Sequence, residues 1–120
     1  PGGQRRRRAE EIATQRMLTD VPKSDVVIVN PTHYAVALSW KRGSGRAPVC
    51  VAKGADEMAA RIRERAAASG VPIRSDPPAA RAIYASVDIG REIRPEHYAA
   101  VAAAIRFAEA MRRKARQSWR

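Results

Sequence analysis

The hydrophobic positions of this chain fall into short strand-like runs and longer helix-like stripes, separated by polar or glycine-containing breaks. The continuous apolar run Val26–Val29 predicts a buried strand over residues 25–29. Similar runs predict strands over residues 32–40, 47–52 and 71–74. The first three strands are close enough in sequence to pair as hairpins, and the fourth returns after a helix, which allows a crossover connection.

Helical patterns fill the intervals between these strands. Residues 4–19 predict a helix whose apolar face is thin, so that the helix is mostly solvated. Residues 55–69 predict a second helix, with acidic residues in its first turn and Gly70 at its end. Residues 77–86 predict a third helix, opened by Asp76 as the N-cap and by proline in the first turn.

The last helix is predicted to begin at Pro95 and to fray into a basic C-terminal tail. Its inward face is expected to consist of Tyr98, Val101, Ala102, Ile105 and Ala108. The order of elements predicts an α/β fold: a small mixed four-stranded sheet packed with about three to four helices and preceded by a basic N-terminal linker helix. A chain of 120 residues is expected to form one folded domain.

The net charge of +11 raises the question of an anionic partner, and the basic residues gather at both ends of the chain. The two clusters are Arg5, Arg6, Arg7 and Arg8 at one end, and Arg112, Arg113, Lys114, Arg116 and Arg120 at the other. Such clusters are compatible with solvated ends, with nucleic acid or with an anionic membrane surface. The chain lacks aromatic residues interleaved with the basic ones, as a single-strand binding groove requires, so no nucleic-acid partner is expected.

The single cysteine, Cys50, excludes an internal disulfide and indicates a reducing compartment. Its place in the predicted strand 47–52 favours a small buried hydrophobic residue over a reactive thiol. Two histidines and one cysteine, far apart in sequence, do not form a metal site, and no cofactor is expected. The longest apolar stretch, Ala99–Ile105, is far shorter than the ~20 residues of a membrane-spanning helix.

The polar turn Asn30-Pro31-Thr32-His33 lies between the first two predicted strands, and an Asn-Pro bond there has unusual chemistry. Ordinary deamidation of asparagine needs the next backbone N–H, which proline lacks. The remaining intramolecular route is attack by the Asn30 side-chain nitrogen on its own backbone carbonyl, which closes a succinimide and expels the Pro31 nitrogen. The residues alone leave a second interpretation open, an uncleaved turn, because Asn and Pro are both frequent turn formers.

For cleavage, the four turn residues are expected to matter in the order Asn30, Pro31, His33 and Thr32. An amide nitrogen is a weak nucleophile, so the main contribution of Asn30 depends on a turn that holds its side chain over the carbonyl. Pro31 blocks deamidation and leaves as the new amino terminus. His33 is expected either to move protons near neutral pH or to hold the turn, and Thr32 to hydrogen-bond the tetrahedral oxygen or the loop backbone.

The turn is part of a set of five segments that together resemble a known family. They are Asn30–Leu38, Ala47–Gly54, Gly70–Ile73, Pro77–Tyr84 and Ile93–Tyr98. In this order and spacing they resemble the cytoplasmic domain of the type III export switch proteins, the flagellar FlhB family and its injectisome relatives. Tyr34 and the Lys53-Gly54 pair are more similar to the flagellar branch, and Cys50 departs from the aliphatic residue expected at that position.

This resemblance implies a membrane domain upstream, with residues 1–23 as its linker helix, residues 24–111 as the self-cleaving domain and residues 112–120 as a basic tail. It implies a place at the cytoplasmic face of the bacterial inner membrane, with Arg5–Arg8 near anionic headgroups. The implied function is to switch the choice of export substrate during flagellum assembly.

The implied partners are export substrates and other proteins of the export apparatus. The two cleaved fragments are expected to stay associated, and the cleavage to be a single intramolecular event rather than enzymatic turnover. The alternative hypothesis is a basic nucleic-acid-binding module that contains an uncleaved Asn-Pro turn.

Overall fold

The computed structural model describes residues 2–118 and contains a mixed four-stranded sheet. Its strands are β1 (Val26–Asn30), β2 (Tyr34–Ser39), β3 (Val49–Ala55) and β4 (Ile73–Ser75). Their order across the sheet is β3-β2-β1-β4. The first three strands pair antiparallel as successive hairpins, and β4 lies parallel to β1 after a helical crossover. The predicted α/β class and the mixed sheet are confirmed.

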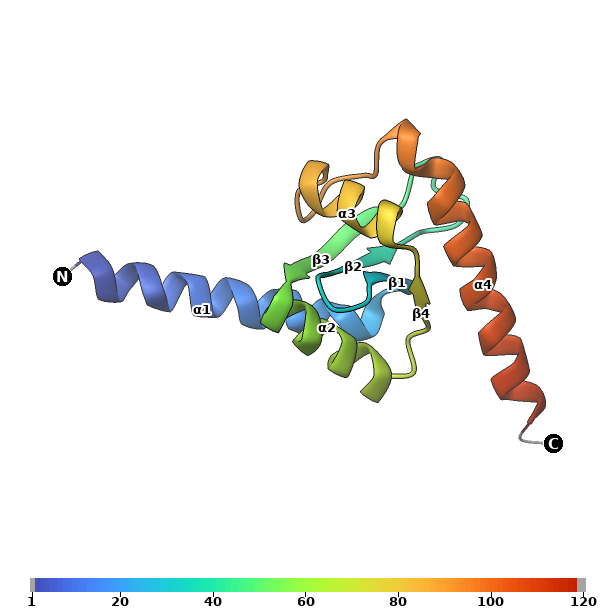
Figure 1. The fold of residues 1–120 in the computed structure, drawn as a ribbon, viewed down its shortest axis with the longest axis horizontal. Helices are drawn as coiled ribbons and strands as arrows, with labels where there is room; N and C mark the ends of the chain where they lie inside the picture. Colours follow the sequence, from blue (N-terminus) through green and yellow to red (C-terminus); the bar gives the residue numbers. More distant parts are fainter. Residues whose placement is uncertain (1, 119–120) are drawn as a thin grey trace.

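Helices cover both faces of this sheet (Figure 1). The α-helices are α1 (Gly2–Asp20), α2 (Asp56–Ala68), α3 (Pro77–Ser86) and α4 (Tyr98–Gln117). Two short 3-10 helices, η1 (Val21–Lys23) and η2 (Pro95–His97), precede β1 and α4. Figure 1 shows α1 and the far part of α4 projecting from opposite sides of the body, each carrying one end of the chain.

The central strand β1 explains why its sequence is continuously apolar. Val26 and Ile28 pack into one core with α3 and α4, whereas Val27 and Val29 pack into a second core with α2 and the end of α1. All five residues of β1 are buried. A strand covered on both faces needs apolar residues at every position, rather than at every second one.

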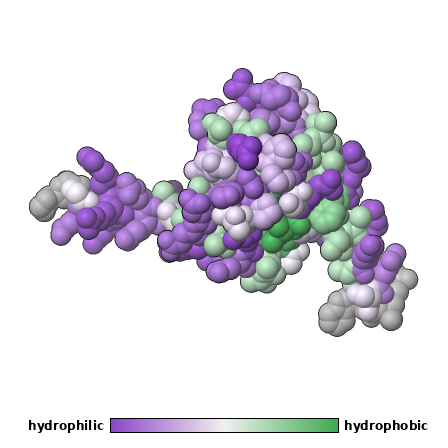
Figure 2. Space-filling model, in the orientation of Figure 1, coloured by the Kyte–Doolittle hydropathy of each residue, from purple (hydrophilic) through white to green (hydrophobic). Residues whose placement is uncertain are grey.

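The N-terminal helix α1 joins the fold only at its last turn. Met17 and Leu18 are buried in the second core, whereas Ile12 is 51% exposed. The projecting part of α1 is covered by hydrophilic side chains in the view of Figure 2. No helix among residues 2–118 is long and apolar enough to cross a membrane.

Two features of α4 differ from the prediction. Tyr98 is 48% exposed and Ala102 is also exposed, so neither belongs to the inward face that we expected them to share with Val101. The buried residues are Val101, Ala104, Ile105 and Ala108, and the two exposed residues instead flank a groove beside the β2–β3 loop. The expected fraying is also wrong, because α4 remains helical to Gln117.

Strand β3 extends beyond its predicted end, through Lys53 and Gly54 to Ala55. Glycine is usually unfavourable inside a strand, which is why the sequence indicated an end there. The structure gives the reason for this glycine: an added Cβ would lie within 2.4 Å of a side-chain carbon of Met58. Gly54 therefore lets α2 pack closely against the strand that precedes it.

Candidate functional site

A tight turn joins β1 and β2, at the position that the sequence predicts. Asn30 and Tyr34 form the last cross-strand pair of the hairpin. The backbone N–H of His33 donates to the backbone carbonyl of Asn30 at 2.8 Å. This is an i to i+3 turn with Asn30 at position i and Pro31 at position i+1, where the fixed φ of proline suits the turn.

Backbone hydrogen bonds from two other parts of the chain hold this turn. The backbone N–H of Asp56 donates to the carbonyl of His33 at 2.9 Å, and that of Asp76 donates to the carbonyl of Val29 at 2.9 Å. Asp56 has a φ of 49°, a left-handed conformation that aspartate adopts more readily than most residues. The junctions β3–α2 and β4–α3 therefore fix the backbone on either side of the Asn30-Pro31 bond.

The four turn residues differ in burial. The Asn30 residue is only 8% exposed, whereas Pro31, Thr32 and His33 are exposed. Asn30 is thus held within the protein, while Pro31 lies at the surface. Within residues 2–118, the side chains of Thr32 and His33 make no hydrogen bond, so their predicted roles in proton transfer or oxygen binding rest on chemistry alone.

The structure adds one group that the sequence analysis missed, the backbone N–H of His33. It points at the carbonyl oxygen of Asn30, which is the oxygen that becomes negative when the side-chain nitrogen attacks. A donor fixed on a developing oxyanion lowers the barrier to such an attack. The i to i+3 pattern of a turn with proline at i+1 contains this signal, whereas our prediction gave Thr32 the role of binding either this oxygen or the loop backbone.

A cluster of side chains beside the turn ties the start of β2 to α3. The rings of Tyr34 and Tyr84 stack with their centroids 4.5 Å apart. Lys53 places its ammonium 5.4 Å from the centre of the Tyr84 ring and donates to the Tyr84 backbone carbonyl at 2.9 Å. That carbonyl lies in the last turn of α3, where a cation interacts favourably with the helix dipole.

The remaining candidates for chemistry are weaker. Cys50 is fully buried in the first core, and burial raises the pKa of its thiol to about 11. A thiol of that pKa is not an activated nucleophile at neutral pH. The described residues contain no group of three or more histidine, cysteine or acidic side chains placed to hold a metal ion.

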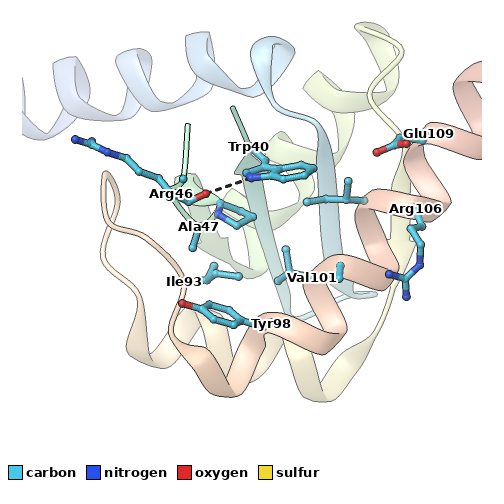
Figure 3. A pocket seen from close by; sticks show the side chains of 12 residues that line it. Trp40, Arg46, Ala47, Ile93, Tyr98, Val101, Arg106 and Glu109 are labelled. Atoms are coloured by element: carbon cyan, nitrogen blue, oxygen red, sulfur yellow. Dashed lines mark hydrogen bonds between the residues drawn. The ribbon is translucent and has the colours of Figure 1, made fainter. Parts of the chain in front are cut away.

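A mostly apolar groove lies at the other end of the sheet, between the β2–β3 loop and α4. Figure 3 shows Trp40 and Ala47 on the loop side facing Ile93, Tyr98 and Val101 on the other. The groove has a volume of about 580 Å³. The Trp40 indole N–H donates to the Arg46 carbonyl at 3.2 Å, which closes the loop and fixes one wall.

The rim of this groove is charged and its floor is apolar. Ile105 and Pro48 complete the apolar lining, while Arg46, Arg106 and Glu109 stand at the edge. A concave apolar surface with a few polar groups at its margin is the usual form of a binding site. The exposure of Tyr98, which the sequence did not predict, belongs to this surface.

Fold and turn together define a small α/β domain with an Asn-Pro bond held in a hairpin turn. The chain belongs to the FlhB HrpN YscU SpaS family, whose model matches residues 2–108. It is 48% identical over 100 residues to the flagellar biosynthetic protein FlhB of Escherichia coli, a match that covers 83% of this chain and 26% of that protein. The chain therefore spans about a quarter of the length of this relative.

Solved structures show the same fold. The cytoplasmic domain of FlhB from Shewanella putrefaciens matches with a TM-score of 0.81 and 36% identity, covering 87% of this chain and 80% of that one. An asparagine-to-alanine variant of the EscU C-terminal domain matches with a TM-score of 0.73 and 32% identity, covering 77% and 92%. The resemblance seen in the sequence is thus confirmed at the level of family and fold.

Proposed function

We propose that this chain is the cytoplasmic domain of a flagellar type III export component, and that it cleaves itself once between Asn30 and Pro31. The observation that carries the cleavage proposal is the turn, in which the Asn30 carbonyl already accepts a hydrogen bond at 2.8 Å from the backbone of His33. The export role rests on the family, and the switch in export substrate is the finer part of the proposal.

The reaction needs only atoms of the turn. The side-chain nitrogen of Asn30 attacks the backbone carbonyl carbon of Asn30 and loses a proton. The tetrahedral oxygen bears negative charge while the His33 backbone N–H donates to it. The carbonyl then re-forms, the C–N bond to Pro31 breaks, and the Pro31 nitrogen takes up a proton. The products are a C-terminal succinimide, which water can open, and a new N-terminal proline.

The fold gives a reason for the two fragments to remain together. Residues 1–30 contain β1, which pairs with β2 on one side and with β4 on the other. Its side chains also fill both cores. Removing β1 would expose both cores to water, so the cut is expected to free the turn without separating the pieces.

The groove between the β2–β3 loop and α4 is the surface that we assign to export substrates. Its apolar floor suits a short segment with exposed apolar side chains, and its volume accommodates a few of them. The cut bond and this groove lie at opposite ends of β2. We infer that cleavage changes a surface at one end of the domain while substrates dock at the other.

The N-terminal helix is assigned to the membrane side. Arg5–Arg8 lie on the projecting, exposed part of α1, where they would face anionic headgroups next to a membrane domain preceding this chain. This places the domain at the cytoplasmic face of the inner membrane, in contact with other export proteins. The cleavage is a single event per molecule, so the domain is not a turnover enzyme.

Intact mass measured over days on the purified chain tests the cleavage. We expect two pieces, 1–30 and 31–120, and a single uncut chain for Asn30→Ala. Asn30 is the only asparagine in the chain, so a succinimide formed from asparagine can come only from this residue. A wild-type chain that stays whole under native conditions would overturn the proposal.

A further inference from the structure

A second concave surface lies where the end of α4 passes the β2–β3 loop. Its volume is about 310 Å³, and all six side chains that line it are charged. They are Asp25, Arg42, Glu109, Arg112, Arg113 and Arg116. We call this surface the arginine cleft. It draws on the C-terminal basic cluster, to which neither the cleavage nor the apolar groove gives a role.

The two carboxylates of the cleft are already engaged by Arg42. The Arg42 guanidinium lies 2.6 Å from a Glu109 carboxylate oxygen and 3.9 Å from an Asp25 oxygen. The second Asp25 oxygen accepts the Trp40 backbone N–H at 2.7 Å. The hydrogen bond from Arg42 lowers the pKa of Glu109, so this carboxylate stays charged and paired with Arg42. Arg42 also stacks over the Trp40 ring at 5.1 Å.

The other three arginines have no carboxylate partner among residues 2–118. Arg112 donates only to the Ser24 backbone carbonyl, at 3.5 Å, and Arg113 and Arg116 form no ion pair in that range. Four arginines against two carboxylates leave the cleft with a net charge of +2 (4 − 2). The side chains of the cleft therefore carry more positive than negative charge.

The helix that carries these arginines continues where the core does not require it. The last buried residue of α4 is Ala108, yet the helix runs on to Gln117. Figure 1 shows this end of α4 pointing away from the end of α1 that carries Arg5–Arg8. The two basic clusters therefore lie at opposite ends of the molecule.

We propose that the arginine cleft binds carboxylates of an acidic segment in a partner protein. The planar fork of arginine matches a carboxylate with two parallel hydrogen bonds. A membrane surface is a poorer fit, because the arginines line a concave surface of about 310 Å³ rather than a flat face. A single-stranded nucleic acid is also a poorer fit, because no aromatic side chain lines the cleft for base stacking.

The test measures binding of a fluorescently labelled octaglutamate peptide to the full chain by fluorescence anisotropy. Arg113→Glu/Arg116→Glu is expected to weaken binding by about tenfold or more. The control Arg81→Glu/Arg91→Glu changes the net charge equally at exposed sites outside the cleft, and is expected to stay within about twofold. Circular dichroism verifies that both variants fold.

Two further probes separate the possible partners at the same salt concentration. Vesicles containing phosphatidylserine and an arbitrary DNA duplex are titrated with the same variants. If the cleft variant loses more affinity for the peptide than for the vesicles or the duplex, an acidic protein segment is supported as the partner. Equal loss in the cleft and control variants would show a general charge effect and overturn the proposal. So would a cleft variant that releases vesicles or duplex more than peptide.

Discussion

The two ends of β2 are held in different ways. At the Tyr34 end, backbone hydrogen bonds from Asp56 and Asp76 fix the turn on both sides of the Asn30-Pro31 bond. At the Trp40 end, side chains do the holding, through the Trp40 indole and the Arg42–Glu109 pair. At the first end, hydrogen bonds tie the backbone to distant segments, and the second end has an apolar groove.

This difference follows from what each end is proposed to do. A weak nucleophile such as an amide nitrogen depends on alignment, and backbone hydrogen bonds provide alignment that side-chain motion does not disturb. A docking surface instead needs apolar area in contact with water until its ligand arrives. The two ends are separated by the six residues of β2, roughly 20 Å of strand, so chemistry and recognition are spatially distinct.

The largest predicted effect comes from a substitution in the turn at the Tyr34 end of β2. Pro31→Ala supplies a backbone N–H, so the side-chain carbonyl of Asn30 becomes open to attack and deamidation competes with chain cleavage. It also frees the φ angle that proline fixes in the turn. We expect most of the chain to stay uncut, with a deamidated fraction at Asn30, measured by intact mass and peptide mapping.

Pro22→Ala is the matched control, because Pro22 is an exposed proline in η1, away from the turn. We expect this variant to be cut as fast as the wild type. Equally fast cleavage of Pro31→Ala would show that proline contributes neither to the route nor to the geometry.

The next effect tests whether the Trp40 end works independently. In a chimera of Escherichia coli FlhB whose matching residues come from this chain, Ala102→Glu would place a charge on the wall of the groove. We expect secretion of export substrates into the medium to fall several-fold, while a denaturing gel shows normal cleavage. Ala99→Glu lies on the same helix but outside the groove, and is expected to secrete normally. Loss of cleavage in Ala102→Glu would mean that the two ends are coupled.

The fold was predictable where local pattern and packing agree. The apolar run of β1, the cap Asp76 and the terminal Gly70 each predicted an element that the structure contains. The prediction was wrong at Gly54 and at Tyr98, where packing against another element decides the outcome. Met58 requires a glycine in β3, and the β2–β3 loop leaves Tyr98 beside an open groove.

The candidate site also has parts that could be predicted from the sequence and parts that could not. The turn and its place between two strands followed from four consecutive residues and the apolar runs on either side. The backbone donor of His33 belongs to the same turn and was implicit in it, whereas the support from Asp56 and Asp76 was not, because backbone contacts between distant segments leave no mark on residue type. The arginine cleft was visible only as a basic tail until the structure placed it beside Arg42 and Asp25.

Substitutions of two lysines, one at each end of β2, allow the stability contributed by the two ends to be compared. Lys53→Met, at the Tyr34 end, removes a part-buried bond to the Tyr84 carbonyl, and should lower the free energy of unfolding by about 1–3 kcal/mol. Lys41→Met, in the exposed loop at the Trp40 end, should change it by less than about 0.5 kcal/mol. Urea denaturation of both variants in the uncut Asn30→Ala background measures the difference. Equal effects would mean that Lys53 does not anchor α3.

The smallest effect concerns Glu109 at the Trp40 end. Its pKa lies below the ordinary value of 4.5 because Arg42 donates a hydrogen bond to it. A lowered pKa in the folded state stabilises the fold above the ordinary value, and this contribution is lost as the pH falls through the folded-state value. We expect Glu109→Gln to be slightly less stable near neutral pH, by a difference that shrinks below 4.5 and in high salt. In an Arg42→Gln background the difference should largely vanish, and its persistence there would assign it to a partner other than Arg42.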